Sequence, residues 1–381
     1  MTGSILHSLG TAVPHHRAAQ TDVAEWAKRV VSAECANAPV GQELPRPVRA
    51  RNEAIDRVYR ASAIRERHSV VPDYTTQPSS FSLYPPNWRL EPVPSTATRM
   101  EMYRREAPPL AEEAVLRCLV RAGYEPSALS HLIVVSCTGF FAPGLDTVLA
   151  TSLGLAPHVQ RLAIGFMGCH AAFNAMRTAD AICRADASAV VLVVCVELCS
   201  LHFQREPTMN NIVANSLFSD GAAAILIRSG RDGSAPGSLA FVDSLTRLEP
   251  DSNEQMAWTI TDTGFQMTLA RDVPDTLQRG IVPFVDALLE RNRVRRCDVG
   301  FWAIHPGGRR IVEVVRDQLR LHADDVAPSF EVLAEQGNMS SPTVLFTLER
   351  ALARRPPTGT LGVALAFGPG ITLESALLRV T

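Results

Sequence analysis

The sequence predicts an α/β layered sandwich that is built from two similar halves, with helices buried between two sheets. Three observations indicate this fold. A pattern of one strand, two helices and two strands occurs twice along the chain. Residues 228–239, rich in glycine and serine, separate the two occurrences and are typical of a joint. Residues 169–185 are rich in alanine and apolar on nearly all sides, as we expect of a helix that is covered all round.

In the first half, the pattern begins at Leu132 with LIVVSCTG, which predicts a buried strand that ends in small polar residues. The segment DTVLATSLGL follows and predicts a helix. A second helix is expected to open at Cys169 and to run to about Arg184. The apolar segments AVVLVVCVE and GAAAILI then predict two strands.

The second half repeats this order. VGFWAIHP predicts a strand that ends at His305, and RRIVEVVRDQL predicts a helix. NMSSPTVLFTLERALARR predicts a helix that opens at Asn338, and GTLGVALAFG and ITLESALLRV predict the two closing strands. We therefore expect two units, residues 1–235 with the cysteine and residues 236–381 with the histidine and the asparagine.

Composition and charge exclude several classes of function. The chain has 381 residues, of which 46% are hydrophobic, and its net charge of −2 gives no overall field that would attract nucleic acid or a membrane surface. The longest apolar run, residues 189–196, is too short to span a bilayer, and the N-terminus does not read as a signal peptide. We therefore expect a cytoplasmic protein with no membrane span.

Lysine and cysteine usage narrow the chemistry further. Lys28 is the only lysine, which excludes a P-loop because that motif needs a phosphate-binding lysine. The eight cysteines show no CxxC pair and no metal-ligand spacing, so we expect neither a metal site nor a disulfide framework. Most of them should be buried thiols.

The duplication predicts where a reactive site would form. Cys169 opens the inner helix of the first half, Asn338 opens the matching helix of the second half, and His305 ends the strand before it. If the two halves pack about a pseudo-twofold axis, a thiol, an imidazole and a carboxamide converge at their junction. Joint occurrence at matched positions favours catalysis over the structural roles that each residue would more often have alone.

Each of these side chains has a chemical reason to be there. The N-terminus of a helix favours the thiolate of Cys169, and His305 beside it strengthens that preference and can form a thiolate–imidazolium pair at neutral pH. The thiolate is a nucleophile for a thioester or another carbonyl. Asn338 can cap its helix, and its amide can also donate to a developing oxyanion. Gly165 and Gly168 are expected to leave room for backbone and substrate.

Five motifs resemble one family. The stretches GFMGCHAAFNAMR, NSLFSDGAAAILI, WAIHPGGRRIVE, GNMSSPTVLFTLE and AFGPGITLE are similar to the type III polyketide synthases, the chalcone synthase group of the thiolase superfamily. The likeness runs in order from about Leu132 to the C-terminus. HPGG, GNMSS and FGPG separate this group from the ketoacyl synthase III enzymes, which share the three residues. The resemblance implies a thiolase-like five-layer αβαβα sandwich of two duplicated halves.

The resemblance also implies roles for the three residues. Cys169 matches the nucleophile that accepts an acyl group from acyl-CoA. His305 and Asn338 match the pair that binds the malonyl thioester carbonyl and stabilises the enolate formed by decarboxylation. Attack of that enolate on the Cys169 thioester extends the chain by two carbons. No metal and no cofactor beyond the CoA thioesters is implied, and a homodimer is expected.

Further positions match the reaction cavity of the family. Phe218 matches one gatekeeper phenylalanine, and Met267 falls where a second would stand, with Phe265 two residues away. The remaining positions that the resemblance assigns to the cavity are Thr138, Cys199, His202, Glu197, Gly368, Pro369 and Gly370. Glu197 matches a residue implicated in aldol cyclisation. The sequence of the segments VCVELCSLHF and GFMGC most resembles bacterial members of the family that take fatty acyl starters and make alkylpyrones or alkylresorcinols.

The CoA phosphates are expected to meet arginines near the N-terminus. Residues 46–67 contain seven of them, and arginine binds phosphate bidentately. Family members hold CoA with basic residues in the equivalent region. We therefore expect Arg60 and Arg65 to take part in CoA binding.

Three alternatives remain open from the sequence. A ketoacyl synthase III-like enzyme would catalyse a single condensation. A papain-like cysteine hydrolase has the same chain order of cysteine, histidine and asparagine, but no CGSCW-type signature occurs here. A non-catalytic dimeric scaffold would keep the fold without needing Cys169, His305 and Asn338. Decarboxylation of malonyl-CoA separates these possibilities.

Overall fold

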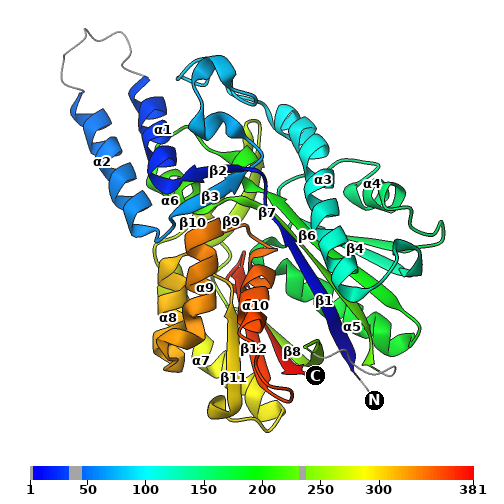
Figure 1. Ribbon diagram of the computed structural model, residues 1–381. Coiled ribbons are helices and arrows are strands. Elements are labelled where there is room, and N and C mark those ends of the chain that lie inside the picture. The colour runs from blue at the N-terminus through cyan, green and yellow to red at the C-terminus, as the bar shows by residue number, and fades with distance from the viewer. Residues whose placement is uncertain (1–2, 34–44, 231–236) are drawn as a thin grey trace.

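A mixed sheet of nine strands forms the centre of the molecule in the computed structural model, which describes residues 3–33, 45–230 and 237–381. The strand order across this sheet is β11-β12-β13-β8-β1-β7-β6-β4-β5 (Figure 1). The strands of the two halves meet where β1 pairs with β8 over only two residue pairs. The sheet is therefore two units joined along a short seam. The expected boundary at residues 235 and 236 lies outside the described residues and stays a prediction.

The first half supplies five strands and three helices to this architecture. Its elements are β1 (Ser4–Ala12), α3 (Thr96–Ala122), β4 (His131–Ser136), α4 (Leu145–Ser152), β5 (Gln160–Gly165), α5 (Ala171–Ala185), β6 (Val190–Leu198) and β7 (Asp220–Ser229). Ser95 begins α3 by accepting a hydrogen bond from the Thr98 amide, and Gly123 ends it in the left-handed conformation.

The second half repeats the same order of strands. Its elements are β8 (Leu239–Leu248), α7 (Val273–Arg291), β11 (Val299–Ile304), α8 (Arg309–Leu319), α9 (Ala323–Gln336), α10 (Thr343–Ala353), β12 (Leu361–Gly368) and β13 (Thr372–Val380). β11 pairs with β12 in parallel, as β4 does with β6, and β12 pairs with β13 antiparallel, as β6 does with β7. The duplication that the sequence predicts is thus present in the pairing of the strands.

Alternation along the strands produces the layers. Ile133 and Val135 of β4 face a core that also contains α5 and α10, whereas Leu132 and Val134 face a second core under α3. In β11, alternate residues likewise divide between the central core and a third core under α7 and α8. The order is therefore helix, sheet, helix, sheet, helix, which confirms the predicted five-layer αβαβα sandwich.

Three details of the predicted element order are wrong. β5 was not expected, because QRLAIG is an edge strand whose residues are largely exposed and so lacks an apolar run. α9 was not expected, because Pro328 lies inside it and such a residue usually indicates a break. α10 begins at Thr343, so Asn338 does not open this helix but lies in the irregular segment before it.

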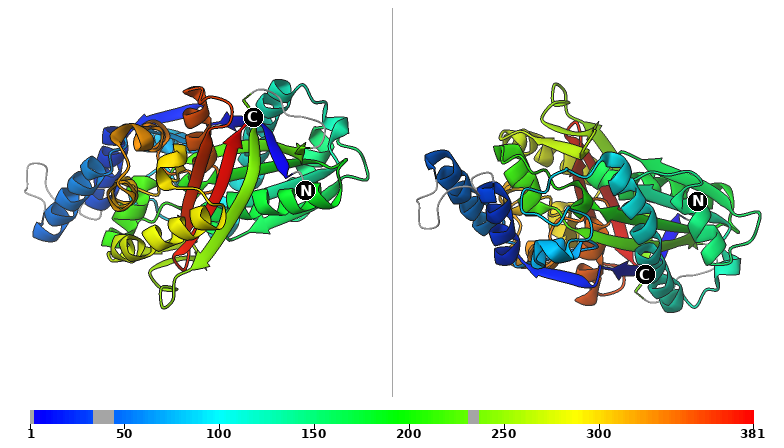
Figure 2. Two further views of the ribbon diagram at one scale, coloured as in Figure 1. Left: turned by 90° about the horizontal axis from the view of Figure 1, so that it is seen from below. Right: turned by 90° about the horizontal axis from the view of Figure 1, so that it is seen from above.

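An N-terminal module covers one end of the sheet. Its elements are β2 (His16–Ala19), α1 (Gln20–Ser32), α2 (Arg46–Ala61) and β3 (Glu66–Ser69), and β2 pairs with β3. Figure 2 shows α1 and α2 at one end of the molecule, opposite the end that carries β5. The helix α6 (Met209–Leu217) and the hairpin of β9 (Met256–Thr261) and β10 (Gly264–Leu269) lie between this module and the second half.

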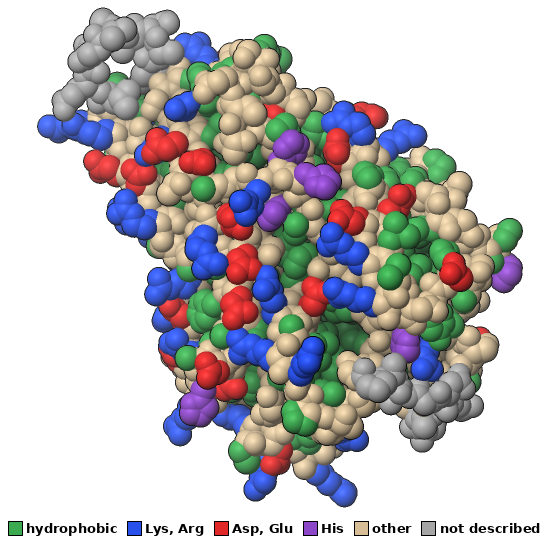
Figure 3. Space-filling view, viewed as in Figure 1, with side chains coloured by type: hydrophobic (Ala, Val, Ile, Leu, Met, Phe, Trp, Pro, Cys, Tyr) green, Lys and Arg blue, Asp and Glu red, His purple; other side chains and the backbone are tan. Residues whose placement is uncertain are grey.

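The described surface carries charges of both signs. Figure 3 shows arginine and acidic side chains interspersed over the side formed by α8, α9 and α10, without a large field of one sign. This agrees with the net charge of −2. No helix among the described residues is both long and apolar enough to cross a membrane. The seven described cysteines are free, and all but Cys297 are buried.

Candidate active site

Cys169, His305 and Asn338 line one cavity of about 350 Å³ between the two halves. Cys169 lies in the turn Gly168–His170 that leads into α5, and His305 follows β11. Asn338 lies between α9 and α10. All three side chains are at least nine-tenths buried. The structure therefore brings together the three residues that the duplicated sequence pattern singled out.

Glycine shapes the turn that holds Cys169. Gly168 has φ +78°, and a Cβ there would stand 2.4 Å from Cδ of Pro369. A Cβ on Gly165 would stand 2.8 Å from the ring of Phe140. Both glycines thus make room for neighbouring protein atoms, and not for substrate as the sequence suggested. They allow the turn to pack closely enough for Cys169 to reach the cavity.

His305 is fixed through its backbone, and its ring is left available. Its amide donates to the Leu365 carbonyl at 2.8 Å, and its own carbonyl accepts from the Gly307 amide at 3.0 Å. Neither ring nitrogen has a hydrogen-bond partner among the described residues. Burial, with a smaller contribution from His170, lowers the pKa of His305 to about 3. The ring is therefore neutral, with one N–H donor and one acceptor nitrogen.

Asn338 is oriented by its own side-chain oxygen. Oδ1 accepts the Ser340 amide at 2.8 Å, and Nδ2 donates to the Gly307 carbonyl at 3.2 Å. Nδ2 carries two hydrogens, and the second can donate on the cavity side, to Cys169 or to a bound group. Because α10 begins five residues later, Asn338 is not the helix cap that the sequence also allowed. Its side chain is an oriented donor.

The environment of Cys169 contradicts the expected thiolate. Burial raises its pKa to about 11, and the charge of Glu197 acts in the same direction. Hydrogen bonds that involve Ser340 and Asn338 only partly offset this effect. His305 is neutral and makes no hydrogen bond to the thiol. Desolvation outweighs the helix N-terminus, so the thiolate–imidazolium pair is not formed in this structure.

The two expected gatekeepers separate the cavity from a second hollow. Phe218 and Met267 line both spaces, and the second has a volume of about 50 Å³. Cys199 and His202 line the second hollow only. Phe265, the alternative to Met267, also lines it. Cys199, His202 and Phe265 therefore lie on the other side of the two expected gatekeepers from the cavity that holds Cys169.

Thr138 and Glu197 line neither space, which corrects their expected place in the cavity wall. Glu197 is fully buried and accepts hydrogen bonds from Thr138 Oγ1 at 2.7 Å and Ser341 Oγ at 2.6 Å. The Cys137 amide donates to the same carboxyl at 2.9 Å. Burial raises the pKa of Glu197 above its usual value. This network lies behind Cys169 and is close enough to influence its pKa.

Gly368, Pro369 and Gly370 do not line the cavity either, although the neighbouring Phe367 does. Pro369 packs against the Cys169 turn at Gly168. Gly370 adopts φ +66° and turns the chain from β12 to β13. These residues support the turn that carries the thiol, and they do not form the wall that the sequence predicted.

Gly368→Ala is expected to lower the stability of the fold by about 1–3 kcal/mol. A Cβ at this position would stand 2.0 Å from Nδ1 of His170, a buried ring beside Cys169. Urea unfolding measures the loss. The double variant His170→Ala/Gly368→Ala should lose less than the sum of the two single variants, because removing the ring makes room for the methyl group. Additive losses would contradict this packing explanation.

The arginines expected to bind CoA are not at the cavity. Arg60 is exposed on α2, and Arg65 is exposed and pairs with Glu335 at 3.3 Å. The end of α2 does reach the cavity, through Val58, Ala61 and Ser62. The arginines that line it are Arg271, Arg309 and Arg310, which are exposed. The sequence carried a signal for two of them, the tandem pair that directly follows the HPGG motif.

The fold and the site define a condensing enzyme of the thiolase type, and comparison with known proteins gives the family. The family model "Chalcone and stilbene synthases, N-terminal domain" matches residues 2–231, and the corresponding C-terminal model matches residues 241–381. The chain belongs to the chalcone and stilbene synthase family and is a type III polyketide synthase, an acyltransferase.

Relatives span the whole chain. The alpha-pyrone synthesis polyketide synthase-like Pks18 of Mycobacterium tuberculosis is 33% identical over 383 residues, which cover 100% of this chain and 92% of that protein. The 3,5-dihydroxyphenylacetyl-CoA synthase of Streptomyces toyocaensis is 34% identical over 312 residues, 77% of this chain and 79% of its own. The crystal structure of PKS-I from the brown alga Ectocarpus siliculosus superposes with a TM-score of 0.90 at 32% identity, covering 100% of this chain and 99% of that one.

Proposed function

We propose that the protein loads an acyl-CoA starter on Cys169, extends it by decarboxylative condensation with malonyl-CoA and cyclises the product. The observation that carries this proposal is the shared cavity. A buried thiol, a neutral imidazole with two unpaired nitrogens and an amide with a fixed orientation all face it. Such a set can form a thioester and stabilise an oxyanion without a metal.

Loading requires a proton acceptor, because the pKa of the Cys169 thiol is about 11. The acceptor nitrogen of His305 faces the same cavity, and we assign it this role. The sulfur attacks the acyl-CoA carbonyl, and the imidazole takes the thiol proton. Collapse of the tetrahedral intermediate releases the CoA sulfur, which receives that proton. The acyl group is left on Cys169 and the neutral imidazole is regenerated.

Extension uses the same ring as a donor. The carbonyl oxygen of the malonyl thioester accepts hydrogen bonds from the N–H of His305 and from Nδ2 of Asn338. Loss of CO2 leaves an electron pair that forms an enolate, whose negative oxygen these two donors stabilise. The enolate carbon attacks the acyl carbonyl on Cys169 and expels the sulfur. The product is a β-ketoacyl-CoA that is two carbons longer.

CoA is proposed to bind with its phosphates against Arg271, Arg309 and Arg310. Arg309 and Arg310 both approach Glu313, at 2.7 and 3.8 Å, so one carboxylate neutralises at most one of the two guanidinium groups. The remaining positive charge suits a diphosphate. Apolar side chains between these arginines and Cys169, among them Val213 and Leu269, suit the pantetheine arm.

A fatty acyl starter that gives an alkylpyrone or alkylresorcinol is the first candidate for the substrate. The support is the apolar lining of the 350 Å³ cavity. A short starter is the second candidate, because the hollow beyond Phe218 and Met267 is only about 50 Å³ and is lined by the rings of Trp258, Phe265 and His202. Trp258 is fixed by a 2.9 Å hydrogen bond to the Cys137 carbonyl. A long chain would need this aromatic wall to move.

Assembly and location complete the proposal. We propose a cytoplasmic homodimer whose subunits meet near β5. Three large apolar side chains near this edge strand are more than one-third exposed, namely Phe140, Leu162 and Met167. An edge strand with apolar neighbours is a common interface for a second copy of the same chain. Sedimentation equilibrium measures the assembly, and a monomer at all concentrations would refute this part.

The experiment that tests the function uses isotopically labelled malonyl-CoA with starters from acetyl-CoA to palmitoyl-CoA. Release of CO2 together with a cyclised polyketide, identified by mass spectrometry, is the expected result. A product extended by one malonyl unit only would support a ketoacyl synthase III-like enzyme. Release of free acid from a peptide or ester without decarboxylation would support the hydrolase. Absence of CO2 release with every starter would refute the proposal.

Trp258→Ala is expected to raise kcat/KM for a long starter relative to a short one by about tenfold or more, because it removes a large side chain that lines the second hollow and so widens it. The measurement is the ratio of kcat/KM for lauroyl-CoA to that for butyryl-CoA. Trp88→Ala serves as the matched control, since Trp88 packs under Arg29 in the N-terminal module and lines neither space. An unchanged ratio in Trp258→Ala would show that this wall does not limit the starter.

A further inference from the structure

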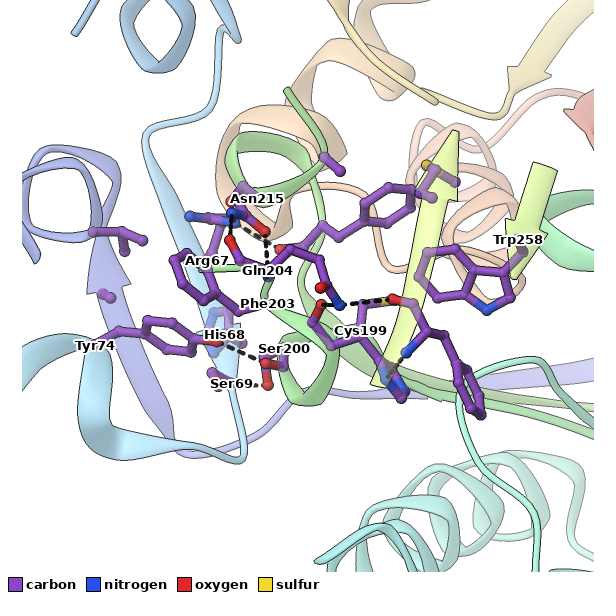
Figure 4. Close-up of a pocket in the computed structure, with 17 residues that line it drawn as sticks. Arg67, His68, Ser69, Tyr74, Cys199, Ser200, Phe203, Gln204, Asn215 and Trp258 are labelled. Carbon is purple, nitrogen blue, oxygen red and sulfur yellow. Dashed lines mark hydrogen bonds between the residues drawn. The ribbon is translucent and has the colours of Figure 1, made fainter. Parts of the chain in front are cut away.

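We propose that Arg67 is a positioning residue that sets both the gatekeeper Phe218 and the donor Asn338, an inference that rests on the proposed condensation. Arg67 lies on β3 in the N-terminal module and touches neither Cys169 nor His305. Its guanidinium instead holds the segment that joins α6 to β7, and this segment pairs with the chain around Asn338. Figure 4 shows Arg67 directed toward Asn215 beside the second hollow.

The C-terminal end of α6 is capped by side chains of the N-terminal module. A helix leaves its last carbonyls without partners inside the helix. Nη1 of Arg67 donates to two of the carbonyls at this end, those of Asn215 and Phe218, both at 2.7 Å. The carbonyl of Ser216, between them, accepts from Nε2 of Gln20 at 2.8 Å. Two side chains of the N-terminal module therefore cap the end of α6, and one of them is a cation placed where the helix dipole favours it.

Hydrogen bonds join the capped end of α6 to Asn338. The Asn338 amide donates to the Leu217 carbonyl at 2.9 Å, and the Ser219 amide donates to the Asn338 carbonyl at 2.9 Å. Phe218 and Asn338 are thus paired like residues of neighbouring parallel strands. The position of the Phe218 ring and the position of the Asn338 backbone are set by the same three-residue stretch. A shift of this stretch would move both.

Arg67 also packs against Gly337, the residue before Asn338. A Cβ on Gly337 would stand 3.1 Å from Cγ of Arg67, and Gly337 has φ +72°. On another side, the guanidinium carbon lies 5.8 Å from the centre of the Tyr59 ring. Arg67 is 7% exposed and forms no ion pair with a carboxylate of the described residues. Its contacts are therefore the backbone carbonyls, an aromatic face and the Gly337 turn.

Loss of the Arg67 side chain would disturb the positions of both Phe218 and Asn338. Two partly buried carbonyls would lose their donor, and the turn at Gly337 would lose its packing. The stretch around Phe218 would then relax, and Nδ2 of Asn338 would no longer be held at the malonyl carbonyl. A displacement of about 1 Å in a catalytic group can reduce the rate by about 100-fold. The position of Cys169 is set by a different contact, that of Gly168 with Pro369, so the thiol should stay in the cavity and lose only its hydrogen bond with Asn338.

The test compares Arg67→Met with Arg67→Lys and measures three quantities. These are kcat and KM for malonyl-CoA decarboxylation, the rate of Cys169 alkylation by iodoacetamide, and the ratio of kcat/KM for long and short starters. Arg67→Met should lower kcat by about 10-fold to 100-fold and change the starter ratio. KM should change less than about twofold, and the alkylation rate should change less than kcat, because Asn338 contributes only one of the hydrogen bonds at the Cys169 thiol. Arg67→Lys should recover part of kcat, because an ammonium group can still donate to the carbonyls.

Arg17→Met is the matched control. Arg17 lies on the paired strand β2, is exposed and contacts Glu66, so the same substitution there should leave all three quantities unchanged. If Arg67→Met does not fold, Gln20→Leu tests the same cap through Ser216 and should show a smaller loss of kcat. A loss of urea stability with unchanged kcat for the folded enzyme would overturn the proposal. So would an equal loss of decarboxylation and alkylation. A wild-type enzyme without decarboxylation would refute the proposed function instead.

Discussion

Asn338→Ala is expected to lower the rate of malonyl-CoA decarboxylation by about 100-fold to 1,000-fold, the usual cost of removing one oxyanion donor. The amide of Asn338 is held at both ends, because Oδ1 accepts from Ser340 and Nδ2 donates to the Gly307 carbonyl. Its second N–H can therefore donate without reorganisation when negative charge develops on the enolate oxygen. The measurement is the initial rate of CO2 release from labelled malonyl-CoA.

Two further variants make this result specific. Asn338→Asp keeps the shape of the side chain but replaces the donor by a carboxylate, and it should be at least as impaired as Asn338→Ala. Asn87→Ala removes an asparagine from an exposed loop, where its amide donates to the Glu91 carbonyl, and should leave the rate unchanged. A rate for Asn338→Asp equal to that of wild type would show that Asn338 is not a donor to the enolate.

The duplicated fold could be predicted from the sequence because its strands are buried on both faces and so form continuous apolar runs. β4, β6, β7 and β11 were found in this way. The same criterion failed at β5, where an edge strand exposes both faces. It also failed at the start of α10, because NMSSP reads as a helix opening while the chain there pairs with Phe218. Such long-range pairing leaves no local signal.

The residues of the candidate site could be predicted where each one stands in a recognisable short motif of the sequence. Cys169, His305 and Asn338 each stand beside glycines in a distinct motif, and the fold then brings them to one cavity. Arg60 and Arg65 show the limit of this approach, since composition marks a basic segment but not the face that each side chain takes. Thr138 and Glu197 show a second limit. Both are near Cys169, but their hydrogen bonds to each other keep them out of the wall.

The protonation of Cys169 was beyond the sequence because it depends on the water excluded by the fold. A helix N-terminus changes the pKa of a thiol only modestly, whereas full burial can raise it by several units. With a pKa of about 11, roughly one thiol in ten thousand is ionised at neutral pH. The neutral His305, which lines the same cavity, is the base that we propose. We therefore expect proton transfer to accompany the attack on the starter and not to precede it.

Cys169→Ala is therefore expected to abolish chain extension, with a loss of at least about 1,000-fold in polyketide formation. The variant cannot form the acyl thioester, so the enolate has no carbonyl to attack. His305 and Asn338 are untouched, because His305 is held through the Leu365 carbonyl and Asn338 through Ser340 and Leu217. CO2 release from malonyl-CoA should consequently continue at a rate of the same order as wild type, with acetyl-CoA as its product.

Cys297→Ala is the control for this variant, since Cys297 is the exposed thiol among the described residues and lines neither the cavity nor the second hollow. It should keep both activities. The comparison of the two assays separates nucleophile from enolate chemistry, because Cys169→Ala should lose one activity and Asn338→Ala both. The Cys169→Ala variant should unfold at the same urea concentration as wild type. If such a folded Cys169→Ala variant lost decarboxylation, the thiol would take part in breaking the carbon–carbon bond to the malonyl carboxylate. The division of roles between the two halves would then be wrong.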